Sequence, residues 1–476
     1  MDAEKEALLM IIKDLTEQIA RLNEKNDALL ALLEEKNHRK TSRNSSVPPS
    51  SEGYSKPAPK SQRKPSGKKP GGQKGHGGSS MNLMKTPDDV VPHYPSACKG
   101  CPNAEFCRKN SRIVEKRYEV DIVVKSNLTA HLQMACCCPR AENKMIQGAF
   151  PANITGTKQY GNNLKAFAAA LSTVGMMGLD RIHELLTSTF QLSVSAGTIE
   201  SWLRRLQKQT APAVKLIKKI VEKQPVVNAD ETGLRVNGSL YWLHCLCNER
   251  WSYLELHSKR GKQAMEDIGI LPRYHGIAVH DFWKPYYNYG QMTHAICNAH
   301  ISRELTYAEE EKHQSWAQEM RQLLLEMNDS RKLLDGMAQT GFQALVLESY
   351  RMRYDRIVEQ GLEANPLFKR TVGQRGRLGK GKIRCLLERL RDYKDDILRF
   401  AADWRIPFTN NEAERSIRFS KVKQKVAGCF RTESGAEEYA QIMSFVNSAR
   451  KHGLNYFEAM KQALNGNALS LVASWM

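Results

Sequence analysis

Two short apolar runs that each end on an aspartate constrain the fold of this chain more than any other feature. The first run, VVNAD, ends at Asp230, and the second, GIAVHD, ends at Asp281. Short runs rich in β-branched and aromatic residues between turn residues are typical of strands. They predict strands at 226–230, 240–247 and 250–257, a short helix at 264–268, and further strands in GIAVHD and in MTHAICNAH.

The order of these elements brings the two aspartates together. Three hairpin strands, a helix and a returning strand resemble the ribonuclease-H-like fold, in which the first and fourth strands are neighbours and each carries an acid. The resemblance implies that Asp230 and Asp281 share one Mg²⁺ site. Glu231 is a rival ligand, although on an alternating strand it faces the other way. A base paired with Asp230, or a turn capped by Asp281, is the plainer alternative.

A third carboxylate comes from the basic stretch TNNEAERSIRFSKVKQKVAGCFR, where Glu414 lies near the start of a predicted helix. Three carboxylates from distant parts of a chain are what a two-metal phosphoryl-transfer site requires. Glu412 points elsewhere on the helix, and an i,i+4 ion pair between Glu414 and Arg418 is the plain alternative. The cations of this helix are candidate phosphate contacts: Arg415, Arg418, Lys421, Lys423 and Lys425.

The charge balance favours a polyanionic partner. The chain has 71 Lys and Arg against 51 Asp and Glu, a formal net charge of +20. Nucleic acid fits this charge better than a membrane, because no run of about 18 consecutive apolar residues occurs. The N-terminus, MDAEKEALLM, is acidic where a signal peptide is basic, so we expect a cytoplasmic protein.

The N-terminal segment predicts a leucine zipper. Leucine recurs every seven residues from Leu8 to Leu29, and Asn26 falls on the same seam. This pattern predicts a coiled coil over residues 1–38 that forms a homodimer or a larger homo-oligomer. The alternative is one amphipathic helix that packs on its own chain.

The following segment, 39–85, predicts a basic disordered linker. It is rich in Ser, Pro, Gly and Lys and contains too little apolar surface to fold. Ten Lys and Arg against one acid between residues 39 and 74 suggest an arm that follows DNA phosphates, with Lys68 and Lys69 among the contacts. A merely soluble linker is the alternative.

A cysteine-rich segment, 86–150, resembles a zinc ribbon. A CxxC pair within CKGCPNAEFC and the later CCC can share one tetrahedral ion. The preferred zinc ligands are Cys98, Cys101, Cys136 and Cys138, with Cys107 and Cys137 as competitors. The intervening stretch, RIVEKRYEVDIVVKSNLTAHLQM, predicts two strands. Reduced structural cysteines without metal are the alternative.

Residues 151–222 predict a helical DNA-binding region. The stretch RIHELLTSTFQLSVSAGTIESWLRRLQ contains two helical segments joined by a polar turn, and Ser195 is a candidate N-cap of the second. This pattern is typical of a helix-turn-helix, whose second helix enters the major groove. Its exposed side would present Glu200, Arg204 and Arg205. The alternative is a helical brace for the domain that follows.

The long stretch between Asp281 and Glu414 predicts a helical insertion. Its basic segment FKRTVGQRGRLGKGKIRCLLERLR nearly matches a phosphate-binding P-loop, but Ile383 occupies the magnesium-binding Ser/Thr position, which argues against an ATPase. His294, Cys297 and His300 suggest a second metal, although a strand followed by a helix start explains them better as packed side chains.

Several motifs in order resemble one family: the zipper, NSSVPPSS, GGQKGHGG, ADET, HDFWKPYY, NAHISREL, NNEAERSIR and FRTESGAEEYAQIMSFVNSARKHGLN. Over nearly its whole length the chain is similar to the large transposase of the insertion-sequence sixty-six group of bacteria, and so to other DDE transposases. The CCC differs from the more regular second zinc-binding knuckle of that family.

The resemblance implies a triad of Asp230, Asp281 and Glu414 that binds Mg²⁺ or Mn²⁺, with Asp230 bridging two ions. It implies double-stranded DNA as the substrate, both at the element ends and at the target. Water would be the first nucleophile, and the freed 3′-OH would then attack target DNA. Accessory transposition proteins are expected partners.

The predicted architecture is therefore multidomain α+β. Its parts are the coiled coil 1–38, the linker 39–85, the zinc-ribbon-like β module 86–150, the helical region 151–222, and a ribonuclease-H-like α/β catalytic core in two pieces, 223–300 and 406–476, around the insertion 301–405. Two other functions compete with transposition. One is a DNA-binding regulator without catalysis, and the other is a nuclease that cuts without joining.

Overall fold

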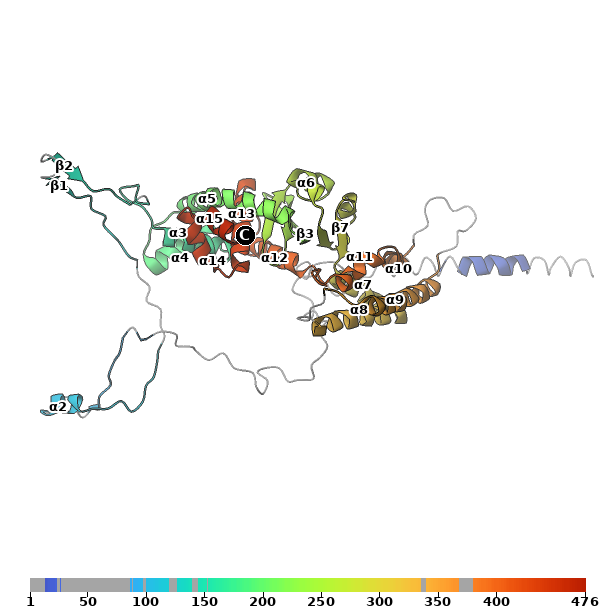
Figure 1. The fold of residues 1–476 in the computed structure, drawn as a ribbon, viewed down its shortest axis with the longest axis horizontal. Helices are drawn as coiled ribbons and strands as arrows, with labels where there is room; N and C mark the ends of the chain where they lie inside the picture. Colours follow the sequence, from blue (N-terminus) through green and yellow to red (C-terminus); the bar gives the residue numbers. More distant parts are fainter. Residues whose placement is uncertain are drawn as a thin grey trace, which may run out of the picture. The chain divides into compact units, whose positions relative to one another are not determined.

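The computed structural model describes residues 13–23, 26, 86–87, 89–96, 100–119, 126–138, 144–151, 153–334, 340–367 and 380–476 (Figure 1). The chain divides into two compact units, Met1–Pro59 with Leu128–Met476, and Lys60–Asn127. Most of the predicted coiled coil, nearly all of the linker with Lys68 and Lys69, and Cys98 lie outside the described residues.

The described part of the zipper is helical. Residues 13–23 form a helix, and Leu15, Ile19 and Leu22 on it are 51%, 57% and 63% exposed. The zipper leucines and isoleucine in this range therefore have no close packing on the described part of the chain. Pairing between chains stays a prediction.

In the described part of the smaller unit, the helix α2 (Ala104–Lys109) contains Cys107 and begins three residues after Cys101, and both cysteines are free thiols. In the larger unit, β1 (Ala135–Cys138) and β2 (Lys144–Gln147) form an antiparallel pair in which Cys136 lies opposite Ile146. The proposed ligands Cys101, Cys136 and Cys138 thus fall in two units. The zinc site stays a prediction.

The prediction of two strands between residues 112 and 134 is wrong for the described part of that stretch. Neither 112–119 nor 126–134 is in a strand, and all of these residues are exposed. An alternating sequence forms a stable sheet only where its apolar side packs on another layer, and these residues have none. The strands β1 and β2 form just beyond the predicted stretch instead.

A five-stranded mixed sheet lies at the centre of the larger unit. Its strands are β3 (Val226–Val236), β4 (Ser239–Cys247), β5 (Ser252–His257), β6 (Ile277–His280) and β7 (Thr293–Ile296). They lie in the order β5-β4-β3-β6-β7. The first three strands are antiparallel, while β6 is parallel to β3 and β7 is parallel to β6. The predicted adjacency of the first and fourth strands is therefore observed.

The strand β3 is longer than predicted, because it continues past Asp230 to Val236. From Asn228 to Val236 it pairs with β4, and the two strands are joined by a two-residue turn at Asn237 and Gly238, whose φ angles are 46° and 79°. Asn-Gly is the preferred sequence for a hairpin turn that requires positive φ at both positions. This turn fixes the register of the hairpin that carries Asp230.

Helices cover both faces of the sheet. Val227 and Ala229 of β3 share a core with α5 (Ala196–Glu222), α6 (Lys262–Ile268), α14 (Tyr456–Leu464) and α15 (Ala468–Ser474). Leu234 and Val236, which alternate with them, pack against α12 (Asn411–Ala427) and α13 (Glu433–Lys451). Because side chains alternate along a strand, β3 separates the two cores.

The edge strand β5 is covered by α13. The backbone N–H groups of Ser252 and Leu254 donate to the hydroxyls of Ser448 and Ser444, at 3.0 and 2.9 Å. These serines are four residues apart and therefore lie on one face of the helix. An edge strand normally presents unpaired backbone groups, and here side chains of a helix satisfy part of them.

The predicted helical pair before the sheet is observed. It consists of α4 (Leu179–Phe190) and α5, with α3 (Asn162–Thr173) beside them. The hydroxyl of Ser195 accepts a hydrogen bond from Thr198 N at 3.1 Å, so the predicted N-cap is confirmed. The second helix continues to Glu222, in agreement with the predicted helical region 151–222, and its Leu206 and Ile217 enter the core shared with β3. This half of α5 braces the sheet.

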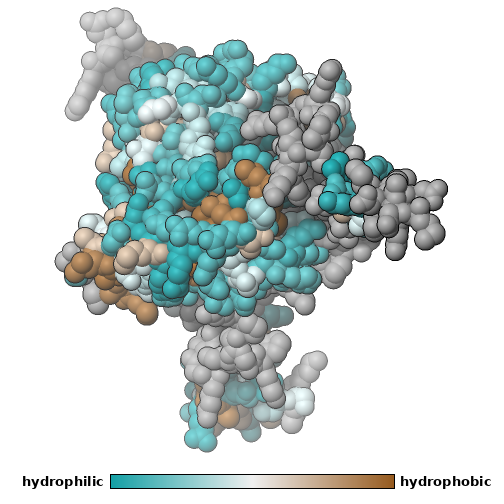
Figure 2. All heavy atoms as spheres, turned by 90° about the vertical axis from the view of Figure 1, so that its right-hand side faces the viewer, coloured by the Kyte–Doolittle hydropathy of each residue, from teal (hydrophilic) through white to brown (hydrophobic). Residues whose placement is uncertain are grey.

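The insertion is helical, as predicted, in its described residues. It comprises α7 (Asn298–Lys312), α8 (Ser315–Leu334), α9 (Ala344–Ala364), α10 (Lys382–Asp392) and α11 (Lys394–Ala402). These helices share a core with Val279 of β6 and Ile296 of β7. The face of the molecule in Figure 2 is mainly hydrophilic, with small apolar areas. In the ranges that the structure describes, no helix is both long and apolar enough to cross a membrane.

Candidate active site

The pairing of β3 with β6 places Asp230 beside Asp281. The parallel register aligns Val226 with Ile277 and Asn228 with Val279. Continued by two residues, the same register aligns Asp230 with Asp281, which directly follows the last residue of β6. Asp281 follows the carboxyl end of the short strand β6, whereas Asp230 lies near the middle of the longer strand β3.

Asn410, just before α12, connects the third acid to β3. Its side chain donates to Ala229 O at 2.8 Å and accepts from Asn228 Nδ2 at 2.8 Å. Its own carbonyl accepts from Glu414 N at 3.2 Å. Asn410 is 1% exposed, so these bonds are shielded from water. They hold the first turn of α12, and with it Glu414, against β3.

The electrostatics of Asp230 show that the three acids interact. Burial raises the pKa of Asp230 well above its usual range, and the negative charges of Glu231, Asp281 and Glu414 raise it further. A hydrogen bond from Glu231 N at 2.9 Å opposes these effects. Such a cluster is stable with a bound proton or with a bound cation that offsets the charge.

Glu231, the rival ligand, is held by other partners. Arg260 donates to its Oε1 at 2.6 and 2.8 Å, and Tyr286 Oη donates to its Oε2 at 2.6 Å. The Glu231 side chain is only 1% exposed. The guanidinium of Arg260 in turn lies over the rings of Trp242 and Trp283, at 4.9 and 4.1 Å from their centres. Both carboxylate oxygens of Glu231 thus accept hydrogen bonds, on the face of β3 opposite to Asp230.

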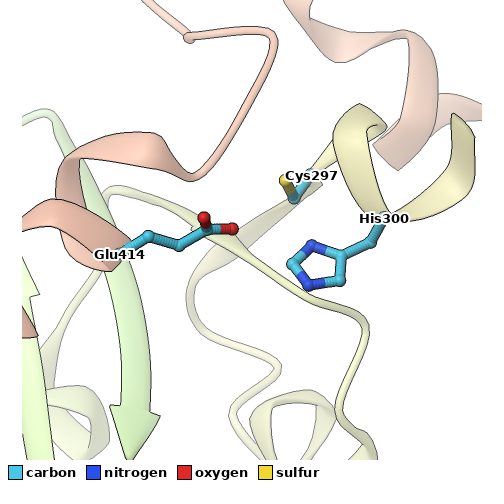
Figure 3. Close-up of side chains that lie close together, drawn as sticks. All are labelled: Cys297, His300 and Glu414. Carbon is cyan, nitrogen blue, oxygen red and sulfur yellow. The ribbon is translucent and has the colours of Figure 1, made fainter. Parts of the chain in front are cut away.

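Figure 3 shows Glu414 pointing from α12 toward Cys297 and His300 at the start of α7. One ligand atom from each of the three side chains lies within 4.8 Å of the other two. Cys297 is fully buried, and its Sγ accepts a hydrogen bond from Asn410 N at 3.1 Å. The sequence favoured packed side chains here, with a second metal as the alternative and with His300 as a candidate neighbour of the active site.

The charge environment of this cluster is unusual. Burial alone would lower the pKa of His300, but the neighbouring sulfur of Cys297 outweighs it and raises the pKa to about 9. Burial alone would raise the pKa of Cys297, but His300 and the N–H of Asn410 lower it. His294 takes no part, because it pairs with His280 at 3.1 Å and stacks on Tyr287. The packing prediction therefore fits His294.

Glu412 is directed away from the aspartates. Its carboxylate pairs with Lys451 of α13 and with Arg415, both at 3.4 Å. It lines a pocket of about 460 Å³ on that side of α12, together with Arg418 and Arg450. Of the two glutamates in the first turn of α12, only Glu414 contributes to the charge around Asp230.

The predicted phosphate contacts differ in their surroundings. Arg415 and Arg418 are exposed, whereas Lys421 donates to Gly233 O and Lys423 donates to Ser172 O. Burial lowers the pKa of Lys423 to about 8. The two lysines therefore attach α12 to β3 and α3, and a role in binding phosphate would require these bonds to break.

The predicted groove contacts on α5 lie on its surface. Arg204 and Arg205 are both exposed. Arg204 pairs with Glu200 at 2.9 Å and with Glu438 of α13 at 3.4 Å. Arg205 is the less engaged of the two, and DNA binding by either residue stays a prediction.

Comparison with known families agrees with this arrangement. The family model described as "Transposase IS66 family" matches residues 157–438, more than half of the chain and a range that includes all three acids. The chain belongs to this family. The resemblance to the insertion-sequence sixty-six group is therefore confirmed. A second model, described as a family of unknown function (DUF6444), matches residues 2–82. No curated protein matches the chain.

One feature of this transposase-family site, the role of Asn410, was not found from the sequence, and another, the pair Cys297 and His300, was given there only as an alternative. The sequence pattern indicated Asn410 only as the start of a helix, whereas its side chain bonds to β3 instead of capping α12. Cys297 and His300 have the spacing C-x-x-H, and the turn from β7 into α7 directs both toward one point. That spacing at a strand-to-helix junction was the available signal.

Proposed function

We propose that this chain cuts and joins DNA at the ends of an insertion sequence, with Asp230, Asp281 and Glu414 as a DDE triad. The observation that carries the proposal is the convergence of the three carboxylates. The register of β3 and β6 aligns the aspartates, and the bonds of Asn410 hold Glu414 against β3. The strand order supports a ribonuclease-H-like core interrupted by the helical insertion.

The residues present fit divalent cations. Mg²⁺ and Mn²⁺ prefer carboxylate oxygens. Glu414 Oε1 is buried and has no hydrogen-bond partner among the described residues, and Asp230 is buried beside the negative charges of Glu231, Asp281 and Glu414, which a cation would offset. Two such ions would activate the attacking oxygen and stabilise the leaving oxygen. Asp230 would contact both ions, Asp281 one of them and Glu414 the other.

The chain's other groups would bind and position the DNA. Arg415 and Arg418 are exposed on the helix that carries Glu414 and are suited to flanking phosphates. Arg204, Arg205, Lys68 and Lys69 are further candidate contacts to double-stranded DNA. We further propose that residues 1–38 assemble a homo-oligomer, that Cys98, Cys101, Cys136 and Cys138 bind Zn²⁺, and that accessory proteins take part in the bacterial cytoplasm.

The test is cleavage of labelled DNA that carries the two ends of the element encoding this chain, with Mg²⁺ or Mn²⁺. We expect D230N, D281N and E414Q to bind this DNA but to lose cleavage. The matched control is E412Q, which alters a glutamate two residues from Glu414 that pairs with Lys451 instead.

Persistent cleavage by D230N or E414Q would exclude these residues as metal ligands. If E412Q loses as much cleavage activity as E414Q, the substitutions act by disturbing α12 and not by removing a metal ligand. A strand-transfer assay with unlabelled target DNA separates a transposase from a nuclease, because only a transposase joins the cut end to the target. End binding without any strand chemistry would indicate a regulator.

A further inference from the structure

We propose that Cys297, His300 and Glu414 form a binding site for Zn²⁺ or a similar transition-metal ion, and that this ion competes with the catalytic metal for Glu414. The zinc site itself stands on geometry alone. Its consequence, inhibition of DNA cleavage, rests on the proposed function.

The three side chains are close enough to share one ion. Their ligand atoms all lie within 4.8 Å of one another. Ligand atoms around a tetrahedral zinc ion are separated by about 3.3 to 3.8 Å, given the usual bond lengths to sulfur, nitrogen and oxygen. The upper limit of 4.8 Å lies close to these separations. Three protein ligands would leave one coordination position open.

Two of the three ligands have buried atoms that await a partner. His300 Nδ1 and Glu414 Oε1 are buried and form no hydrogen bond of normal geometry within the part of the chain that the structure describes, although the sulfur of Cys297 lies close enough to the His300 ring to raise its pKa. Leaving such atoms unsatisfied is destabilising, and more so for a charged group. Glu414 points toward Cys297 and His300 in Figure 3, so one ion at their centre would satisfy both atoms.

The third ligand is already oriented. Cys297 Sγ accepts a hydrogen bond from the backbone N–H of Asn410 at 3.1 Å. Hydrogen bonds of this kind fix the direction of a metal-binding side chain and tune its affinity. Because this donor is a backbone group next to the helix that carries Glu414, it couples two of the ligands through Asn410.

The ligand set selects against Mg²⁺. A thiolate and an imidazole suit Zn²⁺, Co²⁺ or Cu²⁺, whereas Mg²⁺ and Mn²⁺ prefer the oxygens of Asp230 and Asp281. Glu414 is common to both sets. A zinc ion bound to Cys297 and His300 would hold the Glu414 carboxylate on the side of α7, and the catalytic metal would lose its third protein ligand.

The binding test uses the full chain after removal of metal, titrated with Co²⁺ and then with Zn²⁺. A thiolate bound to cobalt gives a charge-transfer band in the near ultraviolet. We expect C297S and H300A each to bind one equivalent less than the wild type, measured as zinc per chain, and C297S to lose part of the band. C385S is the matched control, because Cys385 is an exposed free thiol far from the cluster in sequence, and it should behave as the wild type.

The functional test adds micromolar Zn²⁺ to cleavage reactions with excess Mg²⁺. We expect Zn²⁺ to inhibit cleavage by the wild type and by C385S at least tenfold. Cleavage by C297S should be nearly equal with and without Zn²⁺. Equal stoichiometry and an equal cobalt band in wild type, C297S and H300A would overturn the zinc site. Binding that depends on Cys297, in a chain that never cleaves DNA, would sustain the site and refute the proposed function instead.

Discussion

At the scale of the residue, Asp230 is the group whose state is most sensitive to its surroundings. Burial and three neighbouring carboxylates raise its pKa well above the usual 3.8. In metal-free protein the folded chain therefore holds a proton on Asp230 at pH values at which the unfolded chain has lost it. The stability from this proton is complete below pH 3.8 and is lost as the pH rises through the raised pKa.

The prediction concerns D230N, which cannot ionise at this position. In the presence of a chelator, we expect the free energy of unfolding of the wild type to fall relative to D230N as the pH rises above about 4, by at most about 1.4 kcal/mol per pH unit. Mg²⁺ should restore the wild type and leave D230N unchanged. Urea denaturation at several pH values, with chelator and with Mg²⁺, measures both effects. Parallel pH profiles for the two proteins would contradict the prediction.

At the scale of the element, Asn410 joins β3, α7 and α12. The variant N410A removes the bonds to Ala229 O and Asn228 Nδ2 and leaves two buried groups unsatisfied. We expect a loss of about 1–3 kcal/mol in the free energy of unfolding. Because Glu414 would lose its fixed position, cleavage should fall about 10- to 100-fold.

The control for N410A is N411A, which changes the exposed neighbouring residue. It should keep both stability and cleavage close to those of the wild type. Denaturation and end cleavage measured side by side test the pair of variants. If N410A cleaves DNA as well as N411A does, the hydrogen bonds of Asn410 do not position Glu414.

The elements themselves were predicted to different degrees. The strands before Asp230 and Asp281 and the helical insertion follow from local apolar patterns, and the Ser195 cap follows from local hydrogen bonding. The continuation of β3 to Val236 was missed because the Asn-Gly turn was not used as a signal. The contacts of Asn410 and the position of Glu414 beside Cys297 and His300 depend on chain segments that meet only after folding, so no local pattern encodes them.

At the scale of the whole molecule, the helix at residues 13–23 leaves Leu15, Ile19 and Leu22 exposed. The heptad pattern predicts that a second chain covers them. For the wild type we expect a mass of at least twice 53.9 kDa by light scattering, and for L15D a shift toward the monomer. A20D is the control, because Ala20 lies outside the leucine seam and should tolerate a charge. A monomeric wild type would refute assembly through this helix.

The cover of β5 by α13 has a consequence for protein synthesis. The ribosome makes β5 long before α13, so the edge of the sheet stays open until nearly the whole chain has been made. A chain that stops before Glu433 lacks Ser444 and Ser448 and presents backbone groups to which other strands can pair. We expect such chains to aggregate. Prematurely terminated copies would then not accumulate as soluble fragments that occupy DNA ends and block the complete protein.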